Sequence, residues 1–264
     1  MSATAGDLLG SVVADLATGI RRDRPAALAD EPDAVHQLRT TVRRLRNLLA
    51  AFRRCFDSAG ADELGAALAS YGSLLGECRD LEVRAADARA ALVVLGLTDA
   101  WEPTVVAPLE RVHAAARARL VAWHAGPDAA ALDALLERWV QDPPLRKRAR
   151  RPAGTTARKA VRRQVRRVLR RAEQGAEHDL RKAARRLRHT ADAVASVHPD
   201  AAALGRLGHR VQGVLGDARD AQLLAEHARR CGAEPLAAYA EQAAAVARAH
   251  LAEPLDALRA KADS

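Results

Sequence analysis

Apolar residues recur along most of this chain at the three-to-four-residue spacing that places them on one face of an α-helix. The first such segment runs from Leu8 to Arg22, and the sequence Asp23-Arg24-Pro25 is expected to end it. The next begins after Pro32, with Asp33 as the predicted N-cap, and extends to about Phe56. Runs of β-branched residues are nearly absent and aromatic residues are only 3% of the chain, so the pattern predicts an all-α protein.

Further helices follow the same spacing, and Gly or Pro residues separate several of them. The main interruption is expected at residues 125–154, and we expect the chain to divide there into two halves, 1–142 and 143–264. The other helices are expected at 61–75, continued past a kink at 81–95, and then at 101–124, 132–140, 155–171, 177–197, 204–214, 223–230 and 235–259.

Two sequence patterns occur twice in the chain. The pattern His-x-Leu-Arg, closed by Arg-Arg-Leu-Arg, spans residues 36–46 and returns at residues 178–188 with identical spacing. The pattern Leu-Gly-x-x-Arg-Asp spans residues 75–80 and returns at residues 215–220. Two matches in the same order indicate a tandem duplication. We therefore expect a pair of four-helix bundles related by a pseudo-two-fold axis.

The longer pattern gives its helix one cationic face and one apolar face. At 100° per residue, Arg39, Arg43 and Arg46 fall within roughly 80° of His36, and the apolar residues lie on the opposite side. In the second copy the cationic side holds His178, Arg181, Arg185, Arg188 and His189, and Asn47 lies on this side in the first copy. Arg44 and Arg186 lie on the flank of the two helices. A solvated helix face is the simplest interpretation, but the repetition of the pattern favours contact with a ligand.

The net charge is distributed unevenly between the halves. Residues 1–142 hold 16 Arg and 20 acidic residues, a net charge of −4, whereas residues 143–264 hold 26 Lys or Arg and 13 acidic residues, a net charge of +13. The expected helix 155–171 contributes much of this excess, including Lys159, Arg162, Arg163 and Arg166. Such a surplus attracts polyanions, and the planar guanidinium group can donate paired hydrogen bonds to phosphate or carboxylate oxygens.

Cysteine usage and the N-terminal residues indicate the class of protein. Cys55, Cys78 and Cys231 are too widely separated for a disulfide framework or a zinc motif. The first residues lack the early positive charges of a signal peptide, and no apolar run approaches the roughly 18 residues that span a bilayer. We therefore expect a cytoplasmic protein without membrane contact.

A metal-dependent enzyme is not expected from this sequence. His178-Asp179 resembles the dipeptide of metal phosphohydrolases, but Gln37 stands at the matching place in the first copy. No further cluster of His and Asp residues completes such a site, so neither a metal, a cofactor nor catalytic residues are predicted.

With these four motif copies the chain resembles the CHAD family, named for a conserved histidine on an α-helical domain. The resemblance rests on His-x-Leu-Arg and Arg-Arg-Leu-Arg at 36–46 and 178–188, followed by Leu-Gly-x-x-Arg-Asp at 75–80 and 215–220, and it covers essentially the whole chain. It implies two four-helix bundles around a basic central groove or pore. It also implies binding of inorganic polyphosphate and, in some members, association with polyphosphate granules.

Polyphosphate carries charge but no bases, so its receptor needs rows of cations rather than aromatic stacking platforms. The residues expected to bind it are His36, Arg39, Arg43, Arg44, Arg46, Lys159, Arg162, Arg163, Arg166, His178, Arg181, Lys182, Arg185, Arg186 and Arg188, with Arg21, Arg22, Arg79 and Arg219 as weaker candidates. Asp80 and Asp220 have a structural role in this interpretation, either as helix caps or in ion pairs with arginines of the motif helices.

Other functions remain open at this stage. A nucleic-acid-binding helical protein is the main alternative, because basic helices also bind the phosphates of DNA or RNA, and nucleic acid is expected to compete only weakly with polyphosphate. A hydrolase of phosphate polymers would need a carboxylate cluster that the sequence does not indicate. Membrane association through residues 155–171 is disfavoured because the apolar stripe of that helix is thin and lacks Trp or Phe.

Overall fold

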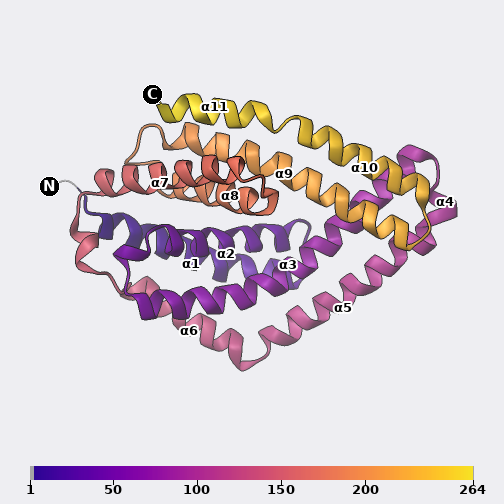
Figure 1. Cartoon of the computed structure of the whole chain (residues 1–264). Coiled ribbons are helices and arrows are strands. Elements are labelled where there is room, and N and C mark those ends of the chain that lie inside the picture. Colours follow the sequence, from indigo (N-terminus) through magenta and orange to yellow (C-terminus); the bar gives the residue numbers. More distant parts are fainter. Residues whose placement is uncertain (1–2, 264) are drawn as a thin grey trace.

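The computed structural model describes residues 3–263, which form helices joined by short connections (Figure 1). The described range holds isolated β-bridges but no strand, so the prediction of an all-α protein is confirmed. The elements are α1 (Ala5–Leu28), α2 (Ala34–Ala51), η1 (Arg53–Cys55), α3 (Ser58–Leu95), α4 (Thr98–Trp101), η2 (Glu102–Val106), α5 (Ala107–His124), α6 (Pro127–Gln141), η3 (Lys147–Arg150), α7 (Ala153–Glu173), α8 (Glu177–Ala193), α9 (Ala201–Arg230), α10 (Glu234–Ala249) and α11 (Ala252–Asp263).

The first helix is longer than the sequence indicated. α1 continues through Pro25 to Leu28, so the prediction that residues 23–25 end it was wrong. Proline removes one backbone donor from a helix, and that loss is tolerable close to the end. Packing holds this last turn in place, because Ala27 is fully buried and Arg24 forms an ion pair with Asp133 of α6 at 2.6 Å.

α2 begins where the sequence placed it but is not capped as predicted. Asp33 precedes the helix in a left-handed conformation, with φ of 61°, and its side chain accepts no capping hydrogen bond. Its carboxylate lies 3.8 Å from the guanidinium group of Arg79 in α3 instead. The helix ends at Ala51, earlier than expected, and η1 follows.

The continuation of the helix past residue 80 is confirmed. The interruption expected between residues 214 and 223 is absent, and one unexpected interruption is present. α3 and α9 run as single helices through residues 75–80 and 215–220, because these segments contain no proline and bury Leu75 and Leu215 on the core side. The segment expected as one helix at 235–259 is divided into α10 and α11. Pro254 lies in the first turn of α11, where its missing N–H group costs little but would have broken a continuous helix.

Both halves of the sequence contribute to the main hydrophobic core. Leu38 and Leu45 of α2 belong to the same buried cluster as Leu180 and Leu187 of α8. A second cluster, from the distal parts of α3 and α9 with η2, α5 and α10, fills the right end of the molecule in Figure 1. The boundary at residue 142 and the pseudo-two-fold relation stay predictions.

The motif helices α2 and α8 meet each other directly. Asn47 of α2 donates a hydrogen bond from Nδ2 to Nδ1 of His189 in α8, at 2.8 Å. These two residues are 142 positions apart, the same separation as the two copies of the motif. The arginines that precede them on each helix are therefore brought to one place.

Candidate anion-binding site

A pocket of about 280 Å³ lies between α2 and α8, with α3 and α9 on its other sides; we call it the central pocket. His36, Arg39 and Arg43 reach it from the first motif helix, and Arg181 and Arg185 reach it from the second. Of the weaker candidates, Arg79 lines it as well. Residues predicted from two distant sequence segments thus share one cavity.

The guanidinium groups in the central pocket are crowded and partly withdrawn from water. Burial, reinforced by neighbouring guanidinium groups, lowers the pKa of Arg43 to about 9 and that of Arg185 to about 10. Both remain charged at neutral pH. A bound anion would offset the repulsion between these cations and the cost of their burial.

The repeated Arg-Arg pairs share an unusual hydrogen-bonding state. Within the described residues, Nε of Arg43, Arg44, Arg185 and Arg186 is buried without a hydrogen-bond partner. A buried donor left without a partner costs about 1–3 kcal/mol, and more when the group is charged. These four donors are therefore groups that a phosphate oxygen or a water molecule would satisfy.

Acidic residues form the facing wall of the central pocket. Asp80 and Asp87 of α3 and Asp217 and Asp220 of α9 line it together. Arg39 donates to Asp80 at 3.0 Å, which confirms the predicted ion pair between Asp80 and a motif-helix arginine. Burial and the neighbouring carboxylates raise the pKa of Asp220, although Arg181 acts in the opposite direction. The sequence patterns did not indicate this acidic wall.

The glycine of the first Leu-Gly-x-x-Arg-Asp motif makes room for this ion pair. A Cβ atom at Gly76 would lie 3.4 Å from Nε and Nη2 of Arg39, in van der Waals contact with the guanidinium group, so a side chain larger than alanine would displace it. Gly216, at the matching place in the second motif, has no such neighbour within 4 Å. The two copies of the motif therefore serve different local purposes.

The two motif histidines occupy different environments. His36 is half-buried in the central pocket, and burial together with the charge of Arg79 lowers its pKa, which keeps the ring neutral at pH 7. His178 is exposed and lines a neighbouring hollow with Arg181 and Arg219. His36 therefore lies inside the central pocket, whereas His178 lies outside it, in a hollow that shares Arg181 with the central pocket.

His189 was not among the residues expected to bind the ligand, yet it lies among arginines of both motif helices. His189 is buried where α2 and α8 meet, and burial with Arg43, Arg44 and other arginines lowers its pKa to about 3. The helical spacing placed His189 on the cationic side of its helix, but nothing in the sequence predicted its contact with Asn47 of the other motif helix.

The remaining motif cations surround the central pocket without lining it. Arg46 and Lys182 are exposed. Burial lowers the pKa of Arg186, and Arg167 and Arg46 contribute to the shift, which places these three cations near one another. Arg188 donates to Nδ1 of His209 at 3.1 Å.

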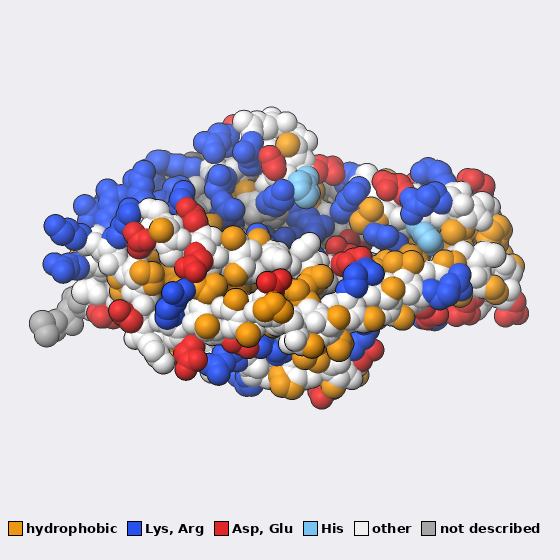
Figure 2. All heavy atoms as spheres, turned by 90° about the horizontal axis from the view of Figure 1, so that it is seen from below, with side chains coloured by type: hydrophobic (Ala, Val, Ile, Leu, Met, Phe, Trp, Pro, Cys, Tyr) orange, Lys and Arg blue, Asp and Glu red, His pale blue; other side chains and the backbone are white. Residues whose placement is uncertain are grey.

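The exposed side of α7 carries a second group of cations. Lys159, Arg162, Arg163, Arg166, Arg167 and Arg170 line one elongated hollow, and within residues 3–263 none of the six forms an ion pair; we call this surface the α7 face. Figure 2 shows Lys and Arg side chains gathered toward its left end, the end at which α7 begins in Figure 1. This face therefore presents concentrated positive charge to solvent.

The other weaker candidates lie in separate surroundings. Arg21 is exposed on α1, and Arg22 forms an ion pair with Asp23 at 2.8 Å. Arg219, beside His178, lies 3.7 Å from Glu226. None of these three lines the central pocket.

Neither a metal-binding cluster nor a membrane-spanning helix is found among the described residues. Residues 3–263 contain no group of three or more His, Cys, Asp or Glu side chains arranged to hold a metal ion, even though four Asp line the central pocket. No helix in the same range combines the length and hydrophobicity needed to cross a membrane.

Comparison with known proteins identifies similar chains. The sequence model of the CHAD domain matches residues 12–229. PptA from Streptomyces chartreusis is 21% identical and superposes with a TM-score of 0.67, over 98% of this chain and 97% of that one. The CHAD domain from the plant Ricinus communis is also 21% identical, with a TM-score of 0.73 over 100% of this chain and 93% of that one. No protein with a curated description matches the sequence.

Proposed function

Because this chain belongs to the CHAD family, we propose that it binds inorganic polyphosphate and that it does so as a receptor rather than as an enzyme. The ligand is held by the arginines of the two motif helices, with His36 in the same pocket and the α7 face as an additional contact surface. Through long chains the protein would also associate with polyphosphate granules in the cytoplasm.

One observation carries this proposal: arginines from both copies of the motif line a single pocket. Four buried Nε donors on these helices have no partner in the described protein, and guanidinium groups pair well with phosphate oxygens. No Phe, Tyr or Trp lines the central pocket, which favours a ligand without bases. Tyr71 stacks on Trp123 with ring centroids 4.8 Å apart, and Phe56 packs on Trp139, so these rings are engaged in the protein interior.

The test removes one arginine from each half. We expect Arg43→Ala combined with Arg185→Ala to weaken binding of long-chain polyphosphate by about 100-fold or more, because each lost charge-assisted contact is worth about 1.5–3 kcal/mol. The control removes Arg138 and Arg259, which are exposed and paired with acidic residues. Unchanged affinity in the first variant, measured by calorimetry, would remove the central pocket from the proposal.

Nucleic acid is the alternative ligand, because the α7 face would also attract the phosphate backbone of DNA or RNA. A competition assay separates the two. We expect unlabelled polyphosphate to displace a labelled oligonucleotide at much lower phosphate concentration than the reverse displacement requires, since the central pocket offers no stacking platform. Equal competition would favour the nucleic-acid function.

A further inference from the structure

A second basic cavity, of about 230 Å³, lies at the end of the molecule where α7 begins; we call it the end pocket. Its cations are Arg54 of η1, Arg148 of η3, Arg151 next to η3, and Lys159 and Arg163 of α7. No acidic residue lines it. Arg54, Arg148 and Arg151 lie outside both copies of the motif, so the sequence patterns gave no reason to single them out.

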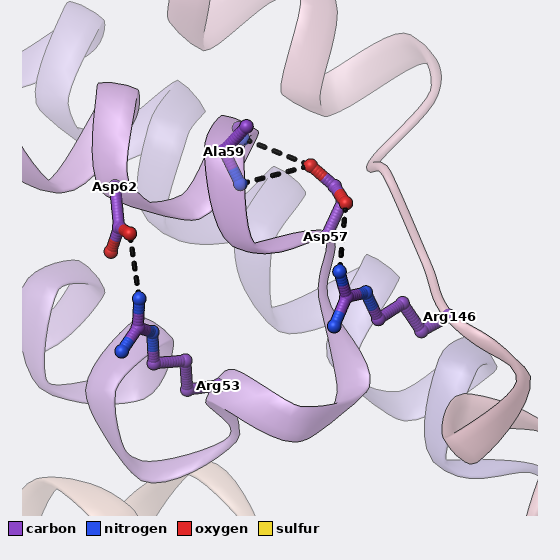
Figure 3. Close-up of polar contacts among 6 residues, drawn as sticks. Arg53, Asp57, Ala59, Asp62 and Arg146 are labelled. Carbon is purple, nitrogen blue, oxygen red and sulfur yellow. Dashed lines mark hydrogen bonds and ion pairs between the residues drawn. The ribbon is translucent and has the colours of Figure 1, made fainter.

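The carboxylates closest in sequence to Arg54 are already engaged elsewhere. Asp62 accepts a hydrogen bond from Arg53 at 2.6 Å (Figure 3). Asp57 caps α3 by accepting from the backbone N–H of Ala59, at 3.0 Å, and it also accepts from Arg146 at 3.2 Å. Among the described residues, the five cations of the end pocket form no ion pair. Arg53 and Arg146 are thus ion-paired outside the end pocket, whereas the cations that line the pocket have no carboxylate partner among the described residues.

Backbone contacts hold the pocket walls together. Asp57 donates its N–H to the carbonyl of Pro144 at 2.7 Å, and Arg146 donates its N–H to the carbonyl of Cys55 at 2.8 Å. The guanidinium group of Arg163 also donates to the carbonyl of Ala51. These contacts tie η1, the connection before η3, and α7 to one another, so the cations are held on a common frame before any ligand arrives.

The first turn of α7 also lines the end pocket. Thr155 and Thr156 supply hydroxyl groups, and the positive end of the helix dipole adds to the attraction for an anion. The start of α1, the first helix of the other half, differs. There the carboxylate of Asp7 accepts a hydrogen bond from the backbone N–H of Thr4 and so completes the helix cap. An anion is favoured at the start of α7 and disfavoured at the start of α1.

We propose that the end pocket is a second phosphate-binding site and, resting on the proposed function, that it binds a separate segment of the polyphosphate chain held by the central pocket. Lys159 and Arg163 line both the end pocket and the α7 face, so the cations continue without interruption from one to the other. Arg167 and Arg186 extend this row toward the motif helices. A chain long enough to reach both pockets gains affinity because its second contact is intramolecular.

The experiment uses two probes and measures their binding by calorimetry. Tripolyphosphate has only three phosphates and the two pockets share no lining residue, so we expect one ion in each pocket and two equivalents bound by the wild-type chain. Arg54→Gln combined with Arg148→Gln and Arg151→Gln should take up one, and Arg43→Ala combined with Arg185→Ala should retain the one at the end pocket. Long-chain polyphosphate should bind the end-pocket variant about tenfold or more weakly, because the intramolecular second contact is lost.

The matched control replaces three arginines that are exposed and paired, Arg53, Arg138 and Arg259, by glutamine. It makes the same change in net charge, and we expect less than about a threefold loss of affinity for long chains. Arg151→Glu alone changes one exposed side chain and provides a test that does not depend on the triple variant folding.

The outcomes separate this inference from the proposed function. Two tripolyphosphate equivalents with unchanged affinity in the end-pocket variant would overturn the inference. So would a loss of the short probe without any loss for long chains, because the pocket would then take free anions rather than a chain segment. A variant of Arg43 and Arg185 that still binds long chains fully, while the end-pocket variant does not, would support the end pocket and overturn the assignment of the central one.

Discussion

The central pocket and the α7 face present arginines in contrasting ways. In the central pocket the guanidinium groups are partly buried, come from both halves of the sequence, and face an acidic wall. On the α7 face the cations come from one helix, most of them are exposed, and they form no ion pairs within the described residues. Burial of the cations in the central pocket destabilises the free protein, and a bound anion would offset that cost. The exposed cations of the α7 face instead attract an anion through a longer-range electrostatic potential. Residue type alone therefore does not determine the energetic role of an arginine.

Single substitutions give the sharpest test of this contrast. We expect Arg185→Ala to weaken polyphosphate binding by about 10- to 100-fold, because a buried charge-assisted contact is lost. Arg166→Ala removes the same charge from the α7 face and should cost less than about threefold, as exposed ion pairs do. Equal losses in a binding titration would show that the two regions act alike.

The salt dependence distinguishes the regions by mechanism. Arg162→Ala combined with Arg166→Ala and Arg170→Ala should weaken binding by roughly tenfold at low salt and much less at high salt. The slope of log affinity against log salt concentration should become shallower by about one for each phosphate contact that is lost. The same number of substitutions on exposed arginines of the first half, such as Arg111, provides the comparison. A slope in the α7 variant equal to that of the wild type would contradict a role for this face in binding.

The pH dependence should come from the central pocket alone. The pKa of His36 is lowered, so its ring becomes positively charged only at a pH lower than that at which a free histidine does. The pKa values of Asp87 and Asp220 are raised, so these carboxylates lose their negative charge at a higher pH than a free aspartate does. Both changes make the pocket more positive as pH falls. We expect affinity to rise several-fold between about pH 7.5 and pH 5.

Asp220→Asn tests the acidic wall directly. The variant should bind polyphosphate more tightly than the wild type near pH 7.5 and should show a flatter pH profile. A profile that falls with decreasing pH would contradict the assignment of these groups to the binding site.

The smallest expected effect concerns stability without ligand. Arg43→Met replaces a crowded, partly buried cation by an apolar side chain of similar length, and such replacements are neutral or stabilising. We expect the free energy of unfolding in urea to rise by about 1 kcal/mol while polyphosphate binding weakens. Arg166→Met should leave the free energy of unfolding unchanged. A clear loss of stability in Arg43→Met would mean that this cation is already compensated by the protein.

Helical periodicity and the internal repeat allowed the main elements and the meeting of the two motif helices to be predicted. Residues 36–46 and 178–188 each have one cationic side, and the structure brings Arg39, Arg43, Arg181 and Arg185 into one pocket. The helix ends were less predictable, because Pro25 is held inside α1 by tertiary contacts of Arg24 and Ala27 that lie outside the local sequence.

The composition of the site was only partly accessible from the sequence. The acidic wall depends on how α3 and α9 are turned toward each other, and spacing along one helix does not reveal that. The difference between His36 and His178 has the same origin, since identical positions in two repeats can face different neighbours. The end pocket combines η1 with η3 and α7, and the last two elements begin about 90 residues or more after Arg54, so local spacing does not reveal the cavity.

The hydrogen bond between Asn47 and His189 has a consequence for a duplicated chain. Two separate, identical subunits meeting at this position would present the same side chain twice, and two neutral imidazoles facing each other through the same ring nitrogen would need opposite tautomers to form a hydrogen bond. Joined in one polypeptide, the two positions are free to differ, and here an amide N–H meets a ring nitrogen that accepts it. The low pKa of His189 keeps that nitrogen available over the physiological range. Fusion thus permits a directional, uncharged junction in the midst of many like charges.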